Sequence, residues 1–403
     1  MELKVKYQYT YFIKPFLIKE TKYKKYIQTL LENKKYKIKY FEKERDLNLY
    51  SYFLPGIRNY LFPSFNYTKD QINELEKTNS NLKSAILSQN SCTTFEYIMD
   101  KTIQGKINEE NGIFFTIDNI KIICFNTGIC FLVIKTAVED NQKFSNILDF
   151  NYKFKDINSD FSKLKEYNNI KIQTDAFSNM QDLPQFINQV TGINCGCAEL
   201  KDIDMYNERF FTYAYACVEE VEEQNLQNEF IKFTNVLSNS NTVEFKAQEI
   251  NKLIQGMHQF KNAKFGFTKQ SASLITLSTD INSYTKLLFE YETDYFYTLL
   301  ISLYQRIYLK KLEIDFKKWE NINVVRTKFT KFTKEIWGKE ITNSVTGTQC
   351  YKKWKDTLEL SELYENIKNK YSIIFKEYTI KKNKVTNLIL VAILILISML
   401  YIF

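Results

Sequence analysis

The sequence predicts an α+β protein: a cytosolic domain with a mixed or antiparallel sheet, a long helical stalk and one C-terminal transmembrane helix. Three observations lead to this prediction. Runs of β-branched and aromatic residues separated by short turns are confined to residues 1–280. Residues 281–384 carry long helical patterns with few breaks. Residues 385–403 are apolar and contain no charge, proline or glycine, so the expected domains are residues 1–280, 281–384 and 385–403.

The bulk composition is that of a folded chain. Its 403 residues are enough for two or three units with cores of their own. Hydrophobic residues make up 44% and aromatic residues 16%, which excludes the disordered class. Only 10 glycines and 4 prolines interrupt the chain, which favours long helices over many short strands.

The N-terminal residues predict a β-α-β unit. Residues 3–13 are β-branched and aromatic with partial alternation, which indicates a strand that ends near Pro15. Thr21 can cap a helix over residues 22–33. Residues 36–41 then indicate a second strand, so a β-α-β start is the economical interpretation.

The clearest β region lies between residues 112 and 137. Its apolar runs are 112–117, 120–125 and 128–137, separated by Asp118-Asn119 and by Asn126-Thr127. Two-residue turns of this chemistry are typical of antiparallel hairpins. We therefore expect three strands joined by two tight turns.

The remaining elements follow from periodicity and from glycine or proline breaks. Further strands are expected at residues 209–218, 264–268 and 273–277. Helices are expected at residues 69–88, 183–190, 225–237, 281–319, 320–337 and from 351 to 403.

The C-terminal nineteen residues predict a single membrane span. As a helix they are about 28 Å long, close to the roughly 30 Å of a hydrocarbon core. Because basic residues stay on the cytoplasmic side, the predicted location is the cell membrane with the N-terminus in the cytoplasm. The alternative is a hydrophobic helix buried in a soluble core. The basic residues that precede the span are Lys376, Lys381, Lys382 and Lys384.

Charge is distributed unevenly along the chain. The formal net charge is +8, with 13 basic and 6 acidic residues in residues 1–50 and 19 basic and 10 acidic residues in residues 301–384. A basic segment beside a span is suited to anionic lipid headgroups. The basic N-terminus could contact nucleic acid or form a solvated helix face. The acidic middle argues against a continuous nucleic-acid track, so a nucleic-acid partner is not expected.

Enzyme motifs are missing from the sequence. It contains no P-loop, G-x-G-x-x-G, H-E-x-x-H or G-x-S-x-G pattern. The one histidine, His258, lies in no motif, and the close pair Cys195 and Cys197 lacks a second pair that would complete a zinc site. We therefore expect no enzyme activity, no cofactor and reduced thiols.

A divalent cation is the one possible exception. Asp149, Asp156 and Asp160, or the acidic cluster from Glu219 to Glu223, could supply oxygen ligands for magnesium or calcium. Neither group has the spacing of a fixed calcium loop, and a solvated acidic face is the alternative interpretation.

The C-terminal part resembles the CorA-type divalent-cation transporter superfamily. The resemblance rests on the helical stretches Y-F-Y-T-L-L-I-S-L-Y-Q-R-I-Y-L at 295–309 and L-Y-E-N-I-K-N-K-Y-S-I-I-F-K-E-Y at 363–378, which precede the predicted span. It implies a funnel-like oligomer with the stalk helices at its centre. The family's second membrane helix and Gly-Met-Asn signature have no counterpart here, because Gly256-Met257-His258 is a different motif elsewhere. Magnesium transport is therefore not carried over.

Two functions follow as expectations. The first is a membrane-anchored, CorA-like sensor or scaffold that forms a homo-oligomer in the bilayer and whose cytosolic domain binds a ligand or partner. The second is an oligomeric cation pore lined by the C-terminal helix, with a further membrane subunit as a possible partner. The residues on the expected pore face, spaced i, i+4, i+7 and i+11, are Asn387, Val391, Leu394 and Ser398.

Overall fold

A computed structural model describes most of the chain. The described residues are 2–99, 102–107, 112–139, 143–157, 170–173, 181–192, 209–219, 222–241, 255–257, 262–317 and 322–402. The chain divides into two compact units. We call them the sheet unit (Met1–Tyr304 and Lys339–Leu358) and the helical unit (Gln305–Gly338 and Glu359–Phe403).

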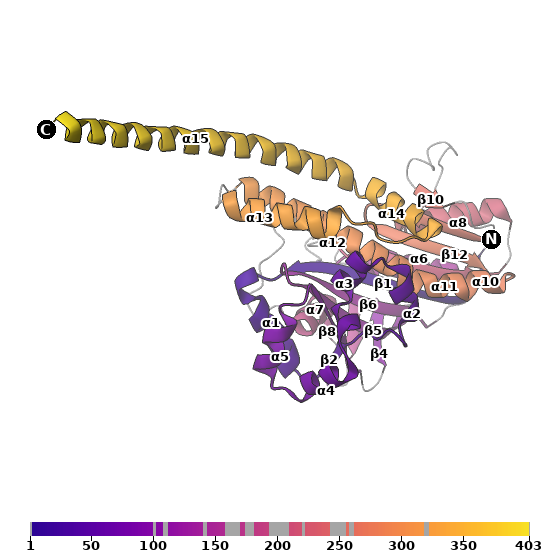
Figure 1. The fold of residues 1–403 in the computed structure, drawn as a ribbon. Coiled ribbons are helices and arrows are strands. Elements are labelled where there is room, and N and C mark those ends of the chain that lie inside the picture. The colour runs from indigo at the N-terminus through magenta and orange to yellow at the C-terminus, as the bar shows by residue number, and fades with distance from the viewer. Residues whose placement is uncertain are drawn as a thin grey trace. The chain divides into compact units, whose positions relative to one another are not determined.

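A 12-stranded sheet dominates the described part of the sheet unit (Figure 1). Its main path runs in the order β10-β11-β12-β9-β1-β6-β5-β4-β7-β8, and β3 pairs with β5 and with β2. Strands β12 and β9 are parallel, whereas β1 is antiparallel to both β9 and β6. The α+β class with a mixed sheet is therefore confirmed. The strands are β1 (Val5–Leu17), β2 (Tyr36–Lys39), β3 (Cys92–Tyr97), β4 (Ile103–Ile107), β5 (Ile113–Phe125), β6 (Ile129–Val138), β7 (Ile170–Gln173), β8 (Gln181–Asp182), β9 (Phe211–Val218), β10 (Gln255–Met257), β11 (Ala263–Phe267) and β12 (Ser271–Leu277).

Strand β1 continues through Pro15, so the prediction that it ends there is wrong. Pro15 lies opposite Phe131 of β6. The pairing of β1 with β9 stops at Ile13, which lies opposite Phe211. Proline lacks the N–H that a strand with two neighbours needs, and here the proline comes after β1 has lost its second neighbour.

Strand β5 replaces the first predicted hairpin. Residues 113–125 form one strand, and the expected turn at Asp118-Asn119 is a bulge where the register with β6 shifts between Ile117 and Asn119. The Asp118 carboxylate accepts a hydrogen bond of 2.9 Å from the Thr116 hydroxyl. The extra residue is accommodated because β6 is long enough to pair with both halves of β5.

The second predicted turn, between β5 and β6, is confirmed. The Gly128 N–H donates to the Phe125 carbonyl over 2.9 Å. Gly128 has φ +81°, a conformation that L side chains rarely adopt. A Cβ at this position would lie 2.1 Å from the carbonyl oxygen of Ile18, so this turn requires glycine.

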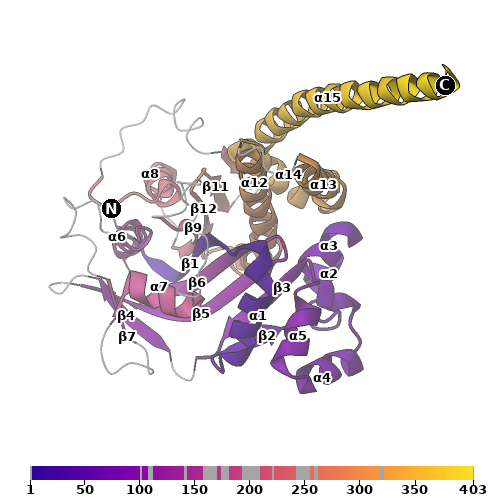
Figure 2. The same ribbon diagram turned by 90° about the vertical axis from the view of Figure 1, so that its left-hand side faces the viewer.

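Both faces of the sheet are covered by aromatic packing. On one face Phe12 packs against Phe154 of α6 with ring centroids 4.4 Å apart. On the other face Tyr213 stacks on Tyr291 of the π-helix η5 at 4.0 Å. Figure 2 places α6, α7 and α8 together on the first side of the sheet. The helices of the sheet unit are η1 (Glu20–Lys22), α1 (Tyr23–Glu32), α2 (Leu47–Tyr52), α3 (Pro55–Leu61), η2 (Pro63–Asn66), α4 (Lys69–Lys77), α5 (Ser80–Leu87), α6 (Phe144–Phe154), α7 (Leu183–Thr191), α8 (Glu223–Asn235), α10 (Ile281–Tyr284), α11 (Lys286–Glu290), η5 (Tyr291–Tyr295) and α14 (Val345–Thr357).

The helix expected over residues 281–319 is divided. The structure has α10, α11 and η5 before α12 (Phe296–Lys317), which begins in the sheet unit and ends in the helical unit. Between α10 and α11, the Thr285 hydroxyl donates 2.7 Å to the Ile281 carbonyl. Thr285 has φ −115° and ψ −71°, which depart from regular helical values and separate the two helices.

The helical unit contains α13 (Ile322–Phe332), the π-helix η6 (Thr333–Trp337) and α15 (Leu360–Ile402) besides the end of α12. Within the described residues, none of the helices combines the length and the apolar character needed to cross a membrane. The prediction of a transmembrane helix at residues 385–403 is therefore wrong.

Candidate functional site

The first part of α15 is held by aromatic packing within the helical unit. Tyr364 stacks on Trp337 with centroids 4.3 Å apart. Tyr371, two turns later, packs against Phe329 of α13 at 5.3 Å. An ion pair of 2.5 Å between Lys370 and Glu313 joins α15 to α12. These contacts fix the base of a helix 43 residues long.

The later part of α15 exposes apolar side chains on every side. We call residues 385–398 the apolar segment. Leu388 is 70% exposed, Leu394 64% and Leu396 61%, although leucine in the sheet core is almost completely buried. The segment is part of the continuous helix α15, and the Thr386 hydroxyl donates a hydrogen bond to the Lys382 carbonyl of the same helix.

The predicted membrane-flanking lysines form what we call the lysine collar: Lys376, Lys381, Lys382 and Lys384. All four are exposed on α15 immediately before the apolar segment. At about 100° per residue they lie near 0°, 140°, 240° and 80° around the helix axis. Glu377 is the acid within this stretch. Positive charge therefore surrounds the helix where the apolar segment begins.

The predicted pore-face residues share one line along α15. Asn387, Val391, Leu394 and Ser398 lie within about 60° of one another by helical geometry, and all four are exposed. The Ser398 hydroxyl donates 2.8 Å to the Ile395 carbonyl of its own helix, which removes the need for a polar partner outside the helix.

The predicted cation ligands make other contacts. The carboxylate of Asp149 accepts a hydrogen bond of 2.8 Å from the backbone N–H of Asn239. Asp156 forms an ion pair of 2.8 Å with Arg209. Asp160 lies outside the described residues. Among the residues described, no three histidine, cysteine or acidic side chains are grouped so that they could hold a metal.

The acidic cluster at 219–223 is also engaged in part. Glu223 forms an ion pair of 2.5 Å with Lys264 of β11, and Glu222 accepts a hydrogen bond of 3.4 Å from Asn225. Glu220, His258, Cys195 and Cys197 lie outside the described residues.

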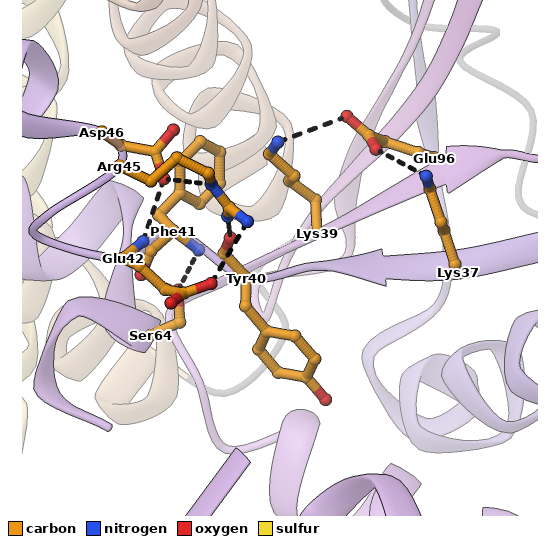
Figure 3. A network of polar contacts seen from close by, with 9 residues as sticks. All are labelled: Lys37, Lys39, Tyr40, Phe41, Glu42, Arg45, Asp46, Ser64 and Glu96. Carbon is orange, nitrogen blue, oxygen red and sulfur yellow. Dashed lines mark hydrogen bonds and ion pairs between the residues drawn. The ribbon is translucent and has the colours of Figure 1, made fainter. Parts of the chain in front are cut away.

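A polar network follows β2 in the sheet unit (Figure 3). Lys37 and Lys39 both face Glu96 of β3, at 3.6 and 3.9 Å. Arg45 pairs with Glu42 at 3.1 Å and donates to the Tyr40 carbonyl. The charged groups of this network form ion pairs and hydrogen bonds with one another and stabilise the turn after β2, so the network has a structural role.

A cavity of about 450 Å³ lies in the sheet unit, where α6, α8 and the start of β9 meet the β11–β12 turn. Among the residues that the structure describes, the charged side chains in its lining are Lys155, Arg209 and Lys269. They lie 54 and 60 positions apart along the chain, each in an ordinary polar stretch. No local sequence pattern therefore groups them.

Comparison of the chain with known protein families, curated proteins and solved structures finds no match.

The CorA-type resemblance therefore stays a prediction, and functional inference rests on the chain's own residues. Two features of the described structure are candidates for a binding function. One is the exposed apolar segment with its lysine collar, which the sequence analysis singled out. The other is the basic cavity, which it missed.

Proposed function

We propose that this protein is a membrane-associated sensor or scaffold that attaches to an anionic lipid surface through the apolar segment of α15. The observation that carries the proposal is the exposure of apolar side chains around the whole circumference of this segment. The sheet unit would then be the part that binds a ligand or partner near that surface.

Energetic arguments support lipid as the cover for this segment. Burying one leucine side chain contributes about 1.5–3 kcal/mol. A partner helix would cover one face, whereas acyl chains can cover all faces at once. Each lysine near an anionic membrane contributes about 1 kcal/mol, and the collar presents its four lysines around the helix at the level where headgroups would lie.

Flotation of the full chain with lipid vesicles tests this proposal. We expect binding to phosphatidylcholine vesicles that becomes stronger when phosphatidylserine is added. The triple variant Leu388→Asn, Leu394→Asn, Leu396→Asn should lower the partition into vesicles by roughly a thousandfold, the equivalent of about 4 kcal/mol of lost burial.

A matched control is available within the chain. Leu47, Leu82 and Val345 are similarly exposed, at 57%, 54% and 74%, but lie in the sheet unit. Their replacement by asparagine should leave vesicle binding unchanged. The proposal fails if the wild-type chain stays with the lipid-free fractions and light scattering shows a defined oligomer, because copies of the chain would then cover the segment.

A further inference from the structure

The N-terminal part of α13 packs beside α15 just before the lysine collar. Tyr371 of α15 packs against Phe329 of α13 with ring centroids 5.3 Å apart. One turn further along α15, the guanidinium carbon of Arg326 lies 4.4 Å from the centre of the Phe375 ring. All of these residues belong to the helical unit. Arg326 therefore adds a basic group from a second helix at the start of the collar.

The aromatic contact positions Arg326 without using its hydrogen-bond donors. A guanidinium over a ring face makes a cation–π contact, whereas its five N–H donors lie in the plane of the group. Arg326 is exposed, and within the described residues its guanidinium makes no hydrogen bond or ion pair. Planar donors of this kind bind two phosphate oxygens at once, which the ammonium of a lysine does not.

The basic groups lie at two levels along α15. The three lysines within residues 381–384 lie roughly 2–6 Å before residue 385, where the apolar segment begins. Lys376 lies roughly 14 Å before it, and Arg326, beside Phe375, lies at about the same level. The collar thus has an inner level of three lysines, and Lys376 and Arg326 form an outer level.

An acid near the outer level lies on the other side of the helix. Glu377 is about 160° around α15 from Phe375, the residue that Arg326 covers. Lys376 is about 100° from Phe375 and is exposed. The side of α15 that carries Arg326 and Lys376 is therefore positive.

The two levels fit two kinds of headgroup. The polar layer on each side of a hydrocarbon core is about 5–8 Å thick. With residue 385 at the hydrocarbon boundary, the phosphate of a lipid such as phosphatidylserine therefore meets the inner lysines. A phosphoinositide carries further phosphates on the part of its sugar ring that projects into water. Those phosphates extend towards the outer level, where Lys376 and Arg326 supply two positive charges.

We propose that Lys376 and Arg326 form a binding surface for lipids with a phosphorylated sugar headgroup, of which a phosphoinositide is the test case. This inference rests on the proposed function, because it requires the apolar segment to enter the lipid surface. It adds a preference among anionic lipids. The inner lysines respond to negative surface charge in general, whereas the outer pair responds to phosphates that project from the surface.

Vesicle flotation at matched surface charge tests this preference. The full chain is compared on phosphatidylcholine vesicles that contain either phosphatidylserine or phosphatidylinositol 4,5-bisphosphate, adjusted to equal measured surface potential. We expect about twentyfold tighter binding to the phosphoinositide vesicles, from roughly fivefold for each of two charges. Equal binding to both would overturn this inference and leave the proposed function standing. Absence of binding to any vesicle would contradict both.

Substitutions at the outer level locate the preference. Arg326→Gln should weaken phosphoinositide binding about fivefold and phosphatidylserine binding by less than about twofold, because salt screens the more distant headgroups. Arg326→Lys keeps the charge without the planar donors, so it should retain only part of the preference. Phe375→Leu keeps every charge and removes the ring beneath the guanidinium, so it should also lower the preference.

Lys334→Gln is the matched control. Lys334 is an exposed lysine of η6 in the same helical unit. Its neighbour Trp337 stacks on Tyr364, eleven positions before Phe375, so Lys334 lies farther from the apolar segment. The control removes the same charge and should leave the preference unchanged. If Arg326→Gln and Lys334→Gln weaken phosphoinositide binding equally, net charge sets the preference and the inference is wrong.

Discussion

Strand β9 and the apolar segment of α15 are both strongly apolar, but their side chains differ in how far they are buried. In β9, Tyr213 is fully buried between the sheet and Tyr291. In α15, Leu388 is 70% exposed. The sheet unit thus obtains its stability from contacts within its own chain. The described side chains of the apolar segment are exposed, and the proposed lipid surface would bury them. This comparison leads to three predictions, in order of expected effect.

Removing a large side chain from the sheet unit should affect stability but not lipid binding. Trp354 of α14 is 0% exposed and contacts Phe267 at 4.7 Å. We expect Trp354→Ala to lower the free energy of unfolding by about 3–5 kcal/mol, measured by urea denaturation. The folded fraction should still float with vesicles. Trp354→Phe is the control and should lower the free energy of unfolding by less. A loss of vesicle binding by folded Trp354→Ala would show that stability of the sheet unit and lipid binding are not separate.

A buried carboxyl should make the sheet unit sensitive to pH. Burial, partly opposed by the Thr293 hydroxyl, raises the pKa of Asp294 to about 7. The native state therefore binds more protons than the unfolded state between about pH 4 and 7, and the free energy of unfolding should decrease as pH rises through this range. The decrease is on the order of 2–4 kcal/mol.

Asp294→Asn isolates that contribution. The amide does not titrate in this range, so the variant should show a flatter dependence of stability on pH and higher stability than the wild type at pH 8. Denaturation curves at pH 4.5, 6 and 8 measure it. An unchanged slope would show that another group causes the dependence. Vesicle binding through the exposed apolar segment should not follow this titration.

Single charges of the lysine collar should have the smallest effect. Lys382→Gln should weaken binding to phosphatidylserine-containing vesicles by about fivefold, corresponding to roughly 1 kcal/mol, and should not alter binding to neutral vesicles. Lys352→Gln changes an exposed lysine of α14 in the same way and is the control. Equal losses in both variants would indicate that net charge, and not the collar, governs attachment.

Local patterns in the sequence predicted where most of the strands lie but not which strands pair with one another across the sheet. The turn at Gly128 could be predicted because glycine and its neighbours determine it locally. The bulge at Asp118 could not, because it depends on the length of β6. Pro15 was misleading for the same reason: the effect of a proline depends on which edge of the strand has a neighbour.

The two candidate sites also differ in whether a local sequence pattern could identify them. The apolar segment and its lysines are contiguous in the sequence, so composition alone identifies them. The predicted span is wrong, because no helix among the described residues is both long and apolar enough to cross a membrane. The basic cavity brings together residues 155, 209, 212 and 269, and only the packing of α6 and α8 beside β9 makes them neighbours. No local pattern contains that information.

The position of β1 also has a consequence for how the protein is made. Strand β1 is paired on one edge by β6 and on the other by β9, which follows it by almost two hundred residues and ends at Val218. At about 5–20 residues per second, roughly 10–40 s separate the synthesis of β1 from that of β9. During that interval the backbone edge of β1 that later pairs with β9 has no native neighbour. Nascent chains paused before Val218 should therefore be the species that chaperones bind most strongly and that aggregates most readily.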